Sequence, residues 1–199
     1  MADFDTIAVD LGGVAARFVP EHRLGALANI TGFERQSVTD RLFRSGLDAR
    51  HELGQVAGVD EAVAALRDAL DQKIGRDDLV AAWSKAFEPV GDVLSILDER
   101  AEQVVLFTNN GPIVEACLDG PLDSIKAVCD SVVCSWRLGA VKPEPEAFAR
   151  FATLVDSSPQ RTLLVDDNTA NIAAALEAGW RASLVRNGAE LRAVLAQTG

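Results

Sequence analysis

The chain has 199 residues, of which 48% are hydrophobic and 25% are charged. This length and balance are those of an ordinary globular protein with one sizeable core and room for a small second domain. A formal net charge of -11, without any clustered Lys/Arg run, argues against binding to nucleic acid or to an anionic membrane surface, because both partners are negatively charged. No apolar run approaches the roughly 18 residues of a membrane span, and no leader-like segment opens the chain, so we expect a soluble, cytoplasmic protein.

Apolar, β-branched runs predict strands at residues 6–10, 103–108, 128–134, 161–166 and 181–185. Helical patterns fill the gaps between the later strands. The clearest helix follows residues 166–167: Asn168 or Thr169 can cap it, Ile172, Ala175 and Leu176 form its apolar stripe, and Gly179 suits its C-terminal end. Strands that alternate with helices of this length predict right-handed βαβ units and an α/β fold with a parallel sheet.

The strand signal disappears between residues 17 and 92, where helical patterns take over. Asp60 precedes one apolar helical face and Asp77-Asp78 precede another, which includes Leu79, Val80, Trp83 and Phe87. Glycines at 32, 46, 58 and 75 mark the connections between these segments. We therefore predict a small helical domain at 17–92, inserted after the first strand into a core formed by 1–16 and 93–199.

Acidic and polar residues follow the predicted strands in an order that indicates one site. Asp10 ends the first strand, Thr108 and Asn109 end the second, and Asp166-Asp167 end a later one. The carboxyl ends of parallel strands meet at one edge of a sheet, so these groups converge. Three carboxylates in one crevice repel one another unless a cation lies between them, and ligands that are all oxygen suit Mg²⁺.

A metal of this kind commonly shares its shell with a substrate phosphate, which needs hydrogen-bond donors of its own. The candidates are the Thr108 hydroxyl, the side chain or backbone N–H of Asn109, the start of a helix at Pro112, and the ammonium of Lys142. With the charge compensated in this way, Asp10 is placed to attack phosphorus and form an aspartyl-phosphate. The residues thus predict covalent phosphoryl transfer on a small phosphorylated metabolite.

The four motifs together resemble those of the haloacid dehalogenase (HAD) superfamily over essentially the whole chain. In order, they are Asp10-Leu11-Gly12-Gly13-Val14, Thr108-Asn109, Lys142-Pro143 and Asp166-Asp167-Asn168. The resemblance implies a Rossmann-like three-layer core with a helical cap. It implies that Asp10 is the nucleophile and that Thr108 and Asn109 bind phosphate. It implies that Lys142 steadies the nucleophile and the phosphate. It also implies that Mg²⁺ is held by Asp10, by Asp167 supported by Asp166, and by the backbone carbonyl of Gly12.

Within the superfamily, the motifs look closest to the α-D-glucose-1-phosphate phosphatase branch. Most phosphatases of the superfamily carry a second aspartate two residues after the nucleophile, where it acts as general acid and base, and Gly12 occupies that position here. Loss of a general acid/base typically costs about 10²- to 10⁴-fold in rate. Activity would then favour a leaving group that departs easily, such as an anomeric sugar oxygen, and the branch that this chain resembles also has glycine there.

Two other functions stay open at this stage. A 2-haloacid dehalogenase would use Asp10 to attack carbon without a metal, but Asp166-Asp167 argue against it, because uncompensated carboxylates disfavour a bound haloacid anion. A phosphate-binding or regulatory protein with negligible turnover is made possible by Gly12. Arg17 and Arg44 are candidates for contacting a substrate, although an exposed arginine is more often simply solvated. Neither the substrate nor the oligomeric state can be inferred from the sequence.

Overall fold

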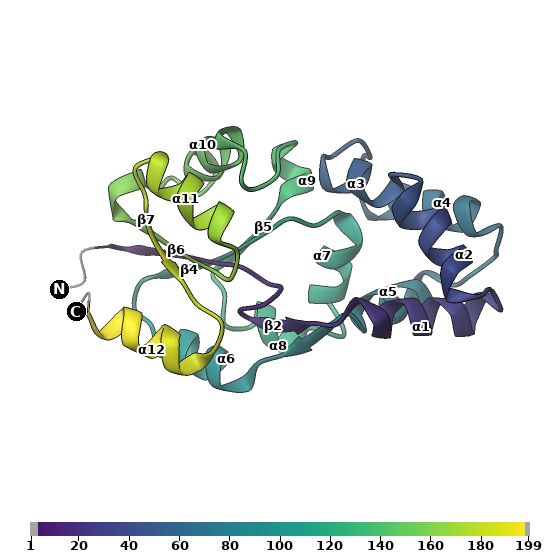
Figure 1. Ribbon diagram of the computed structural model, residues 1–199, viewed down its shortest axis with the longest axis horizontal. Coiled ribbons are helices and arrows are strands. Elements are labelled where there is room, and N and C mark those ends of the chain that lie inside the picture. Colours follow the sequence, from purple (N-terminus) through teal and green to yellow (C-terminus); the bar gives the residue numbers. More distant parts are fainter. Residues whose placement is uncertain (1–3, 198–199) are drawn as a thin grey trace.

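Five parallel strands form the central sheet in the order β5-β4-β1-β6-β7 (Figure 1). The strands are β1 Thr6–Val9, β4 Gln103–Thr108, β5 Ser131–Cys134, β6 Thr162–Asp166 and β7 Arg181–Leu184. The structure is a computed structural model that describes residues 4–197, so the outermost ends of the predicted core, residues 1–3 and 198–199, lie outside the described residues. The prediction of an α/β fold with a parallel sheet is confirmed.

The sheet is buried on both faces because apolar residues occupy successive strand positions. On β4, Val104 and Leu106 belong to one buried cluster, whereas Val105 and Phe107 belong to a second cluster on the opposite face. Helices cover each face and complete three layers (Figure 1). The first cluster is covered by α6 Gly91–Asp98, α7 Pro112–Leu118, α8 Asp123–Lys126 and α12 Gly188–Ala196, and the second by α9 Ser135–Leu138, α10 Pro145–Leu154 and α11 Thr169–Glu177.

Two details of the core differ from the sequence prediction. Strand β5 begins at Ser131 rather than at 128, because the Cys129 N–H bonds to the Lys126 carbonyl at 3.0 Å and closes a turn. Helix α11 has the predicted Asn168 cap, whose side chain accepts from the N–H of Ala170, but Leu176 is 55% exposed and does not belong to its buried stripe. A short 3-10 helix, Pro159–Arg161, leads into β6.

The segment between β1 and α6 is mainly helical, as predicted. It contains α1 Pro20–Thr31, α2 Arg35–Thr39, a π-helical turn Asp40–Arg44, α3 Leu47–Glu52, α4 Val59–Leu70 and α5 Arg76–Ser84. All four predicted glycines flank helix ends. The prediction that this segment has no strand is wrong at its edges: β2 Ala16–Phe18 pairs antiparallel with β3 Phe87–Pro89, so Phe87 lies in a strand and not in α5. This ribbon joins the helical cap to the core.

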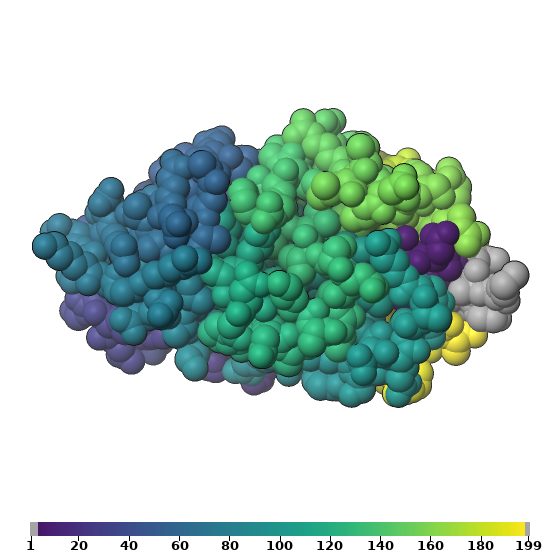
Figure 2. Space-filling model, turned by 180° about the vertical axis from the view of Figure 1, so that it is seen from behind, coloured from purple at the N-terminus to yellow at the C-terminus, as the bar shows by residue number. Residues whose placement is uncertain are grey.

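The cap packs closely against the core. Figure 2 shows the blue surface of the cap directly beside the green surface of the core. A Cβ atom at Gly111 would lie 2.8 Å from the Cβ of His51, and one at Gly54 would lie 2.2 Å from the carbonyl oxygen of Trp136. Glycine is required at both positions because α3 approaches the core backbone this closely. No helix within residues 4–197 combines the length and apolarity that crossing a membrane requires.

Candidate active site

The ends of three neighbouring strands bring the predicted catalytic groups together. Asp10 follows β1 and its N–H bonds to the Val165 carbonyl at 3.0 Å, while Thr108 and Asp166 are the last residues of β4 and β6. Because β1 lies between β4 and β6, Asp10 is at the centre of this edge. The convergence inferred from strand order is therefore present in the fold.

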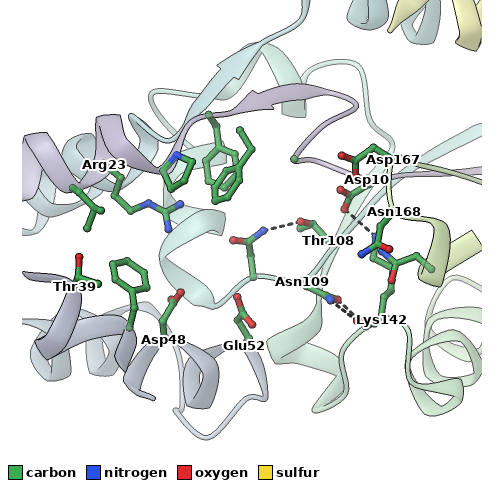
Figure 3. Close-up of a pocket in the computed structure, with 18 residues that line it drawn as sticks. Asp10, Arg23, Thr39, Asp48, Glu52, Thr108, Asn109, Lys142, Asp167 and Asn168 are labelled. Atoms are coloured by element: carbon green, nitrogen blue, oxygen red, sulfur yellow. Dashed lines mark hydrogen bonds and ion pairs between the residues drawn. The ribbon is translucent and has the colours of Figure 1, made fainter. Parts of the chain in front are cut away.

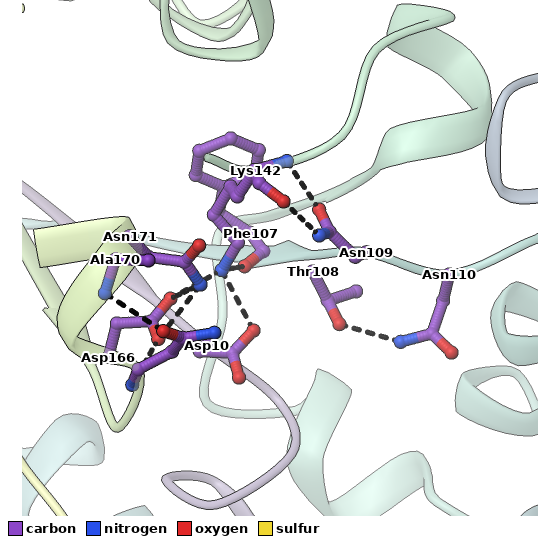
Figure 4. Close-up of polar contacts among 10 residues, drawn as sticks. Asp10, Phe107, Thr108, Asn109, Asn110, Lys142, Asp166, Ala170 and Asn171 are labelled. Carbon is purple, nitrogen blue, oxygen red and sulfur yellow. Dashed lines mark hydrogen bonds and ion pairs between the residues drawn. The ribbon is translucent and has the colours of Figure 1, made fainter. Parts of the chain in front are cut away.

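Lys142 is the hub of the polar network at this edge (Figure 4). From the loop between α9 and α10, its Nζ donates to Asp10 Oδ1 at 2.9 Å, to Asp166 Oδ2 at 2.7 Å and to the carbonyl of Phe107 at 2.8 Å. The side chain is only 1% exposed. Burial lowers the pKa of the ammonium, but Asp10 and Asp166 more than offset this, so the net shift is upward and Lys142 is charged.

Asp166 is completely buried and hydrogen-bonded through both oxygens. The Nδ2 of Asn171 donates to its two oxygens at 3.0 and 3.1 Å, and the N–H of Asn168 donates to Oδ1 at 2.9 Å. The first turn of α11 thus orients this carboxylate, which in turn orients Lys142.

Asp10, Asp166 and Asp167 form an acidic cluster that fits a hard divalent cation. One oxygen from each lies within 4.8 Å of the others, and oxygen ligands of this kind suit Mg²⁺. The backbone makes room for Asp167 at Gly13, where φ is +90° and a Cβ atom would lie 2.1 Å from Asp167 Oδ2. The second glycine of the first motif therefore allows the close approach of the Asp167 carboxylate, a role that the motif alone did not reveal.

The charges within the cluster are poorly compensated by protein groups alone. Burial raises the pKa of Asp10 to about 6; Lys142 opposes this shift and Asp166 adds to it. Burial and the neighbouring Asp166 also raise the pKa of Asp167. A bound cation would favour the ionised form of both carboxylates and make Asp10 a better nucleophile at neutral pH.

The end of β4 carries a buried hydroxyl, and the next residue has a side-chain amide that is hydrogen-bonded to the main chain of Lys142, which we call the Asn109 clamp. Thr108 is 2% exposed, and its Oγ1 accepts a hydrogen bond from Asn110 Nδ2 at 2.7 Å. The Asn109 side chain is engaged at both ends by the main chain of Lys142: Nδ2 donates to the carbonyl at 2.7 Å, and Oδ1 accepts from the N–H at 2.8 Å. The Lys142 main chain therefore fixes the Asn109 side chain but uses only one of its two Nδ2 hydrogens, so the side chain and the backbone N–H of Asn109 both stay candidates for binding phosphate.

A cavity of about 450 Å³ opens over these groups, between the core and the cap (Figure 3). The predicted residues that line it are Asp10, Gly12, Thr108, Asn109, Lys142 and Asp167. Arg17 and Arg44 are not among the lining residues: Arg17 is exposed and pairs with Glu88, and Arg44 is exposed and pairs with Asp40 at 2.9 Å. Their predicted contact with substrate stays a prediction.

Three charged cap residues that the sequence interpretation did not select line the cavity as well: Arg23 from α1, and Asp48 and Glu52 from α3. The spacing of Asp48 and Glu52 places both on one face of a helix. The sequence prediction gave a helical segment at 17–92 but did not delimit α3 within it. Arg23 sits in an unremarkable stretch of the sequence. No local pattern distinguishes it from a solvated arginine.

The chain belongs to the haloacid dehalogenase-like hydrolases, whose family model matches residues 4–179. The predicted superfamily and the prediction of a hydrolase are thereby confirmed, whereas the glucose-1-phosphate phosphatase branch stays a prediction. A relative, D-ribitol-5-phosphate phosphatase from Bacteroides thetaiotaomicron, is 27% identical over 196 residues and is matched over 94% of both chains.

Solved structures share the fold over nearly the whole length. A predicted HAD-like family hydrolase from Porphyromonas gingivalis superimposes with a TM-score of 0.78 at 21% identity, covering 98% of each chain. A HAD family enzyme from Bacteroides thetaiotaomicron, in complex with magnesium and inorganic phosphate, superimposes with a TM-score of 0.74 at 20% identity, covering 93% of this chain and 96% of its own. At these identities the likeness establishes the fold.

Proposed function

We propose that this protein is a Mg²⁺-dependent phosphatase that hydrolyses a small phosphorylated metabolite through an aspartyl-phosphate on Asp10. The observation that carries the proposal is the juxtaposition of Asp10, Lys142 and the acidic cluster at one strand edge, beneath the cap. The predicted cofactor has independent support from the structural neighbour solved with magnesium and phosphate. The relative that acts on D-ribitol 5-phosphate supports a sugar or sugar-alcohol phosphate as the first substrate class to test.

In this proposal Asp10, Asp167 and the carbonyl of Gly12 would hold the metal, with the buried Asp166 completing the acidic cluster and supporting Asp167. Mg²⁺ supplies, when bound, charge neutralisation and polarisation of the phosphoryl group. Thr108, the Asn109 N–H and Lys142 bind the phosphate oxygens, and the Asn109 clamp holds Lys142 in place.

The reaction proceeds in two displacements. A carboxylate oxygen of Asp10 attacks phosphorus and the ester P–O bond breaks, with the electron pair leaving on the alcohol oxygen. Gly12 has no side chain that could donate a proton, so the alcohol oxygen takes its proton from water or from another group in the cavity. Water then attacks the phosphorus of the aspartyl-phosphate, which releases inorganic phosphate and restores the Asp10 carboxylate.

The test is phosphate release from a panel of sugar, sugar-alcohol and nucleotide phosphates, including α-D-glucose 1-phosphate, with Mg²⁺ and with EDTA. We expect turnover that requires Mg²⁺ and that falls by at least about 10³-fold in Asp10→Asn, because the nucleophile is lost. Undiminished activity of Asp10→Asn would remove the nucleophile assignment. Demonstrable Mg²⁺ binding without turnover of any ester would favour the phosphate-binding alternative, and halide release from 2-haloacids would favour the dehalogenase.

A further inference from the structure

The cavity above Asp10 has two chemically different walls (Figure 3). The core wall carries Asp10, Asp167, Lys142 and the residues at the end of β4. The opposite wall belongs to the cap and carries Arg23, Asp48 and Glu52. We call these three residues the cap wall. Phe18, Phe43 and Phe87 line the space as well and add apolar faces. A volume of about 450 Å³ falls within the range of small-molecule sites, about 300–1,000 Å³.

Arg23 is a buried cation with an unused donor. The residue is 4% exposed, and its Nε donates to the Trp83 carbonyl at 3.1 Å. The guanidinium stacks over Trp83, with its carbon 4.3 Å from the ring centroid, and lies 5.2 Å from that of Phe87. Its Nη2 is buried without a hydrogen-bond partner among the described residues. A buried, unpaired donor is costly to maintain, and here it belongs to a side chain that lines the cavity.

Asp48 and Glu52 give the cap wall acceptors beside this donor. They are one helical turn apart on α3, and both line the cavity. The end of α3 is held against the core because Ser135 Oγ donates to the Glu52 carbonyl at 2.8 Å. Burial raises the pKa of Glu52 to about 7, with a further contribution from Asp48, and burial raises the pKa of Asp48, opposed by Arg23. At neutral pH the Glu52 carboxyl is therefore able both to donate and to accept hydrogen bonds.

The cap wall lacks the charge balance of an anion site. Arg23 attracts both carboxylates electrostatically, but within the described part of the chain its Nη2 has no hydrogen-bond partner. A second phosphate or a carboxylate on the ligand would face two acidic side chains for one guanidinium. Hydroxyl groups can satisfy a guanidinium donor and carboxyl acceptors together, and the C–H faces of the same ligand can pack on the aromatic rings.

We infer that the cap wall, Arg23 with Asp48 and Glu52, is a subsite for an uncharged, polyhydroxylated leaving group. The substrate class is then a monophosphate of a sugar or sugar alcohol without a second anionic group. The inference rests on the proposed function only in placing the phosphate end of the ligand at Asp10.

Binding to the Asp10→Asn protein tests the subsite without requiring turnover. With Mg²⁺ present, titration calorimetry compares D-ribitol 5-phosphate with n-pentyl phosphate, which has a chain of the same length but no hydroxyls, and with 2-phosphoglycolate, which has a second anion. We expect D-ribitol 5-phosphate to bind at least about tenfold more tightly than either, because only its hydroxyls pair with the cap wall. Equal affinity for the first two ligands, or tighter binding of 2-phosphoglycolate, would overturn the inference.

Variants of the cap wall then identify the residues. In the same background, Glu52→Gln and Asp48→Asn, which nearly conserve shape, should each reduce the preference for D-ribitol 5-phosphate over n-pentyl phosphate by about fivefold or more. Asp68→Asn is the matched control, because Asp68 is an exposed cap carboxylate on α4 outside the cavity lining. A preference that survives both variants would refute the assignment. Failure of the proposed function would show separately, as absence of turnover by the wild-type protein whatever the binding preference.

Discussion

Replacing the proposed nucleophile is expected to stabilise the metal-free protein. Asn keeps the shape of Asp10 and an oxygen that can accept the hydrogen bond that Lys142 now donates at 2.9 Å. It removes a carboxylate whose ionisation is unfavourable in the fold, since burial raises the pKa of Asp10 from 3.8 to about 6. Asp10→Asn should therefore unfold at a higher urea concentration than the wild type in EDTA at pH 7.

The magnitude follows from the pKa difference between the folded and unfolded chains. The pKa of Asp10 rises from 3.8 in the unfolded chain to about 6 in the folded one, a difference of about 2 pKa units. At about 1.4 kcal/mol per pKa unit, ionisation of Asp10 destabilises the folded wild type by about 3 kcal/mol at pH 7. The pKa is raised on folding, so this penalty grows as the pH rises from the unfolded value to the folded one. At pH 5, below the folded-state pKa, the buried carboxyl is mostly protonated and the penalty falls to about half of its value at pH 7. Below the unfolded pKa it vanishes.

Equilibrium urea unfolding, followed by tryptophan fluorescence in EDTA, measures both values. The expected advantage of Asp10→Asn is about 3 kcal/mol at pH 7 and about half of that at pH 5. Saturating Mg²⁺ should reduce or reverse the advantage, because the cation stabilises the ionised carboxylate of the wild type. Equal stability of the two proteins at pH 7 in EDTA, or a difference that does not change with pH, would refute the electrostatic reasoning.

Three other substitutions test the site. Gly13→Ala should weaken Mg²⁺ binding by about 10-fold or more in calorimetry, because the new Cβ would displace Asp167; unchanged affinity would mean that Asp167 is not a ligand. Gly12→Asp fits sterically, since its Cβ would lie 3.5 Å from Phe18, and it should raise kcat by about 10-fold or more for esters with poor leaving groups. A folded variant with no such gain would argue that proton donation does not limit the rate. Lys142→Met should lower the free energy of unfolding by about 3–5 kcal/mol, because it leaves buried carboxylates unpaired; a loss under about 1 kcal/mol would contradict the pairing.

Much of the core could be predicted because the relevant signals are local. The strands contain consecutive apolar residues, such as 104–107, and only a sheet covered on both faces buries all of them. Asp10 directly follows such a strand, and Thr108 and Asp166 end two others, so a parallel arrangement is sufficient to bring them to one edge. Glycines at helix ends likewise marked the cap connections from the sequence alone.

Other features depend on contacts between segments distant in sequence. The partners of Arg17 and Arg44 could not be inferred, and both arginines pair with exposed carboxylates outside the cavity lining. The exposure of Leu176 depends on how α11 lies against the sheet. The ribbon of β2 and β3 joins residues about 70 positions apart, and three-residue strands carry too little periodicity to be recognised.

The sequence by itself determined the class of fold and the chemistry of the strand edge, because hydrophobic periodicity and the order of the acidic motifs suffice to specify both. Only the tertiary structure decided what faces that edge. The orientation of the cap depends on close backbone approaches such as that of Gly111 to His51, and this orientation turns Arg23, Asp48 and Glu52 towards the cavity. The place of these three residues in the cavity lining results from that packing, and no local sequence pattern around them predicts it.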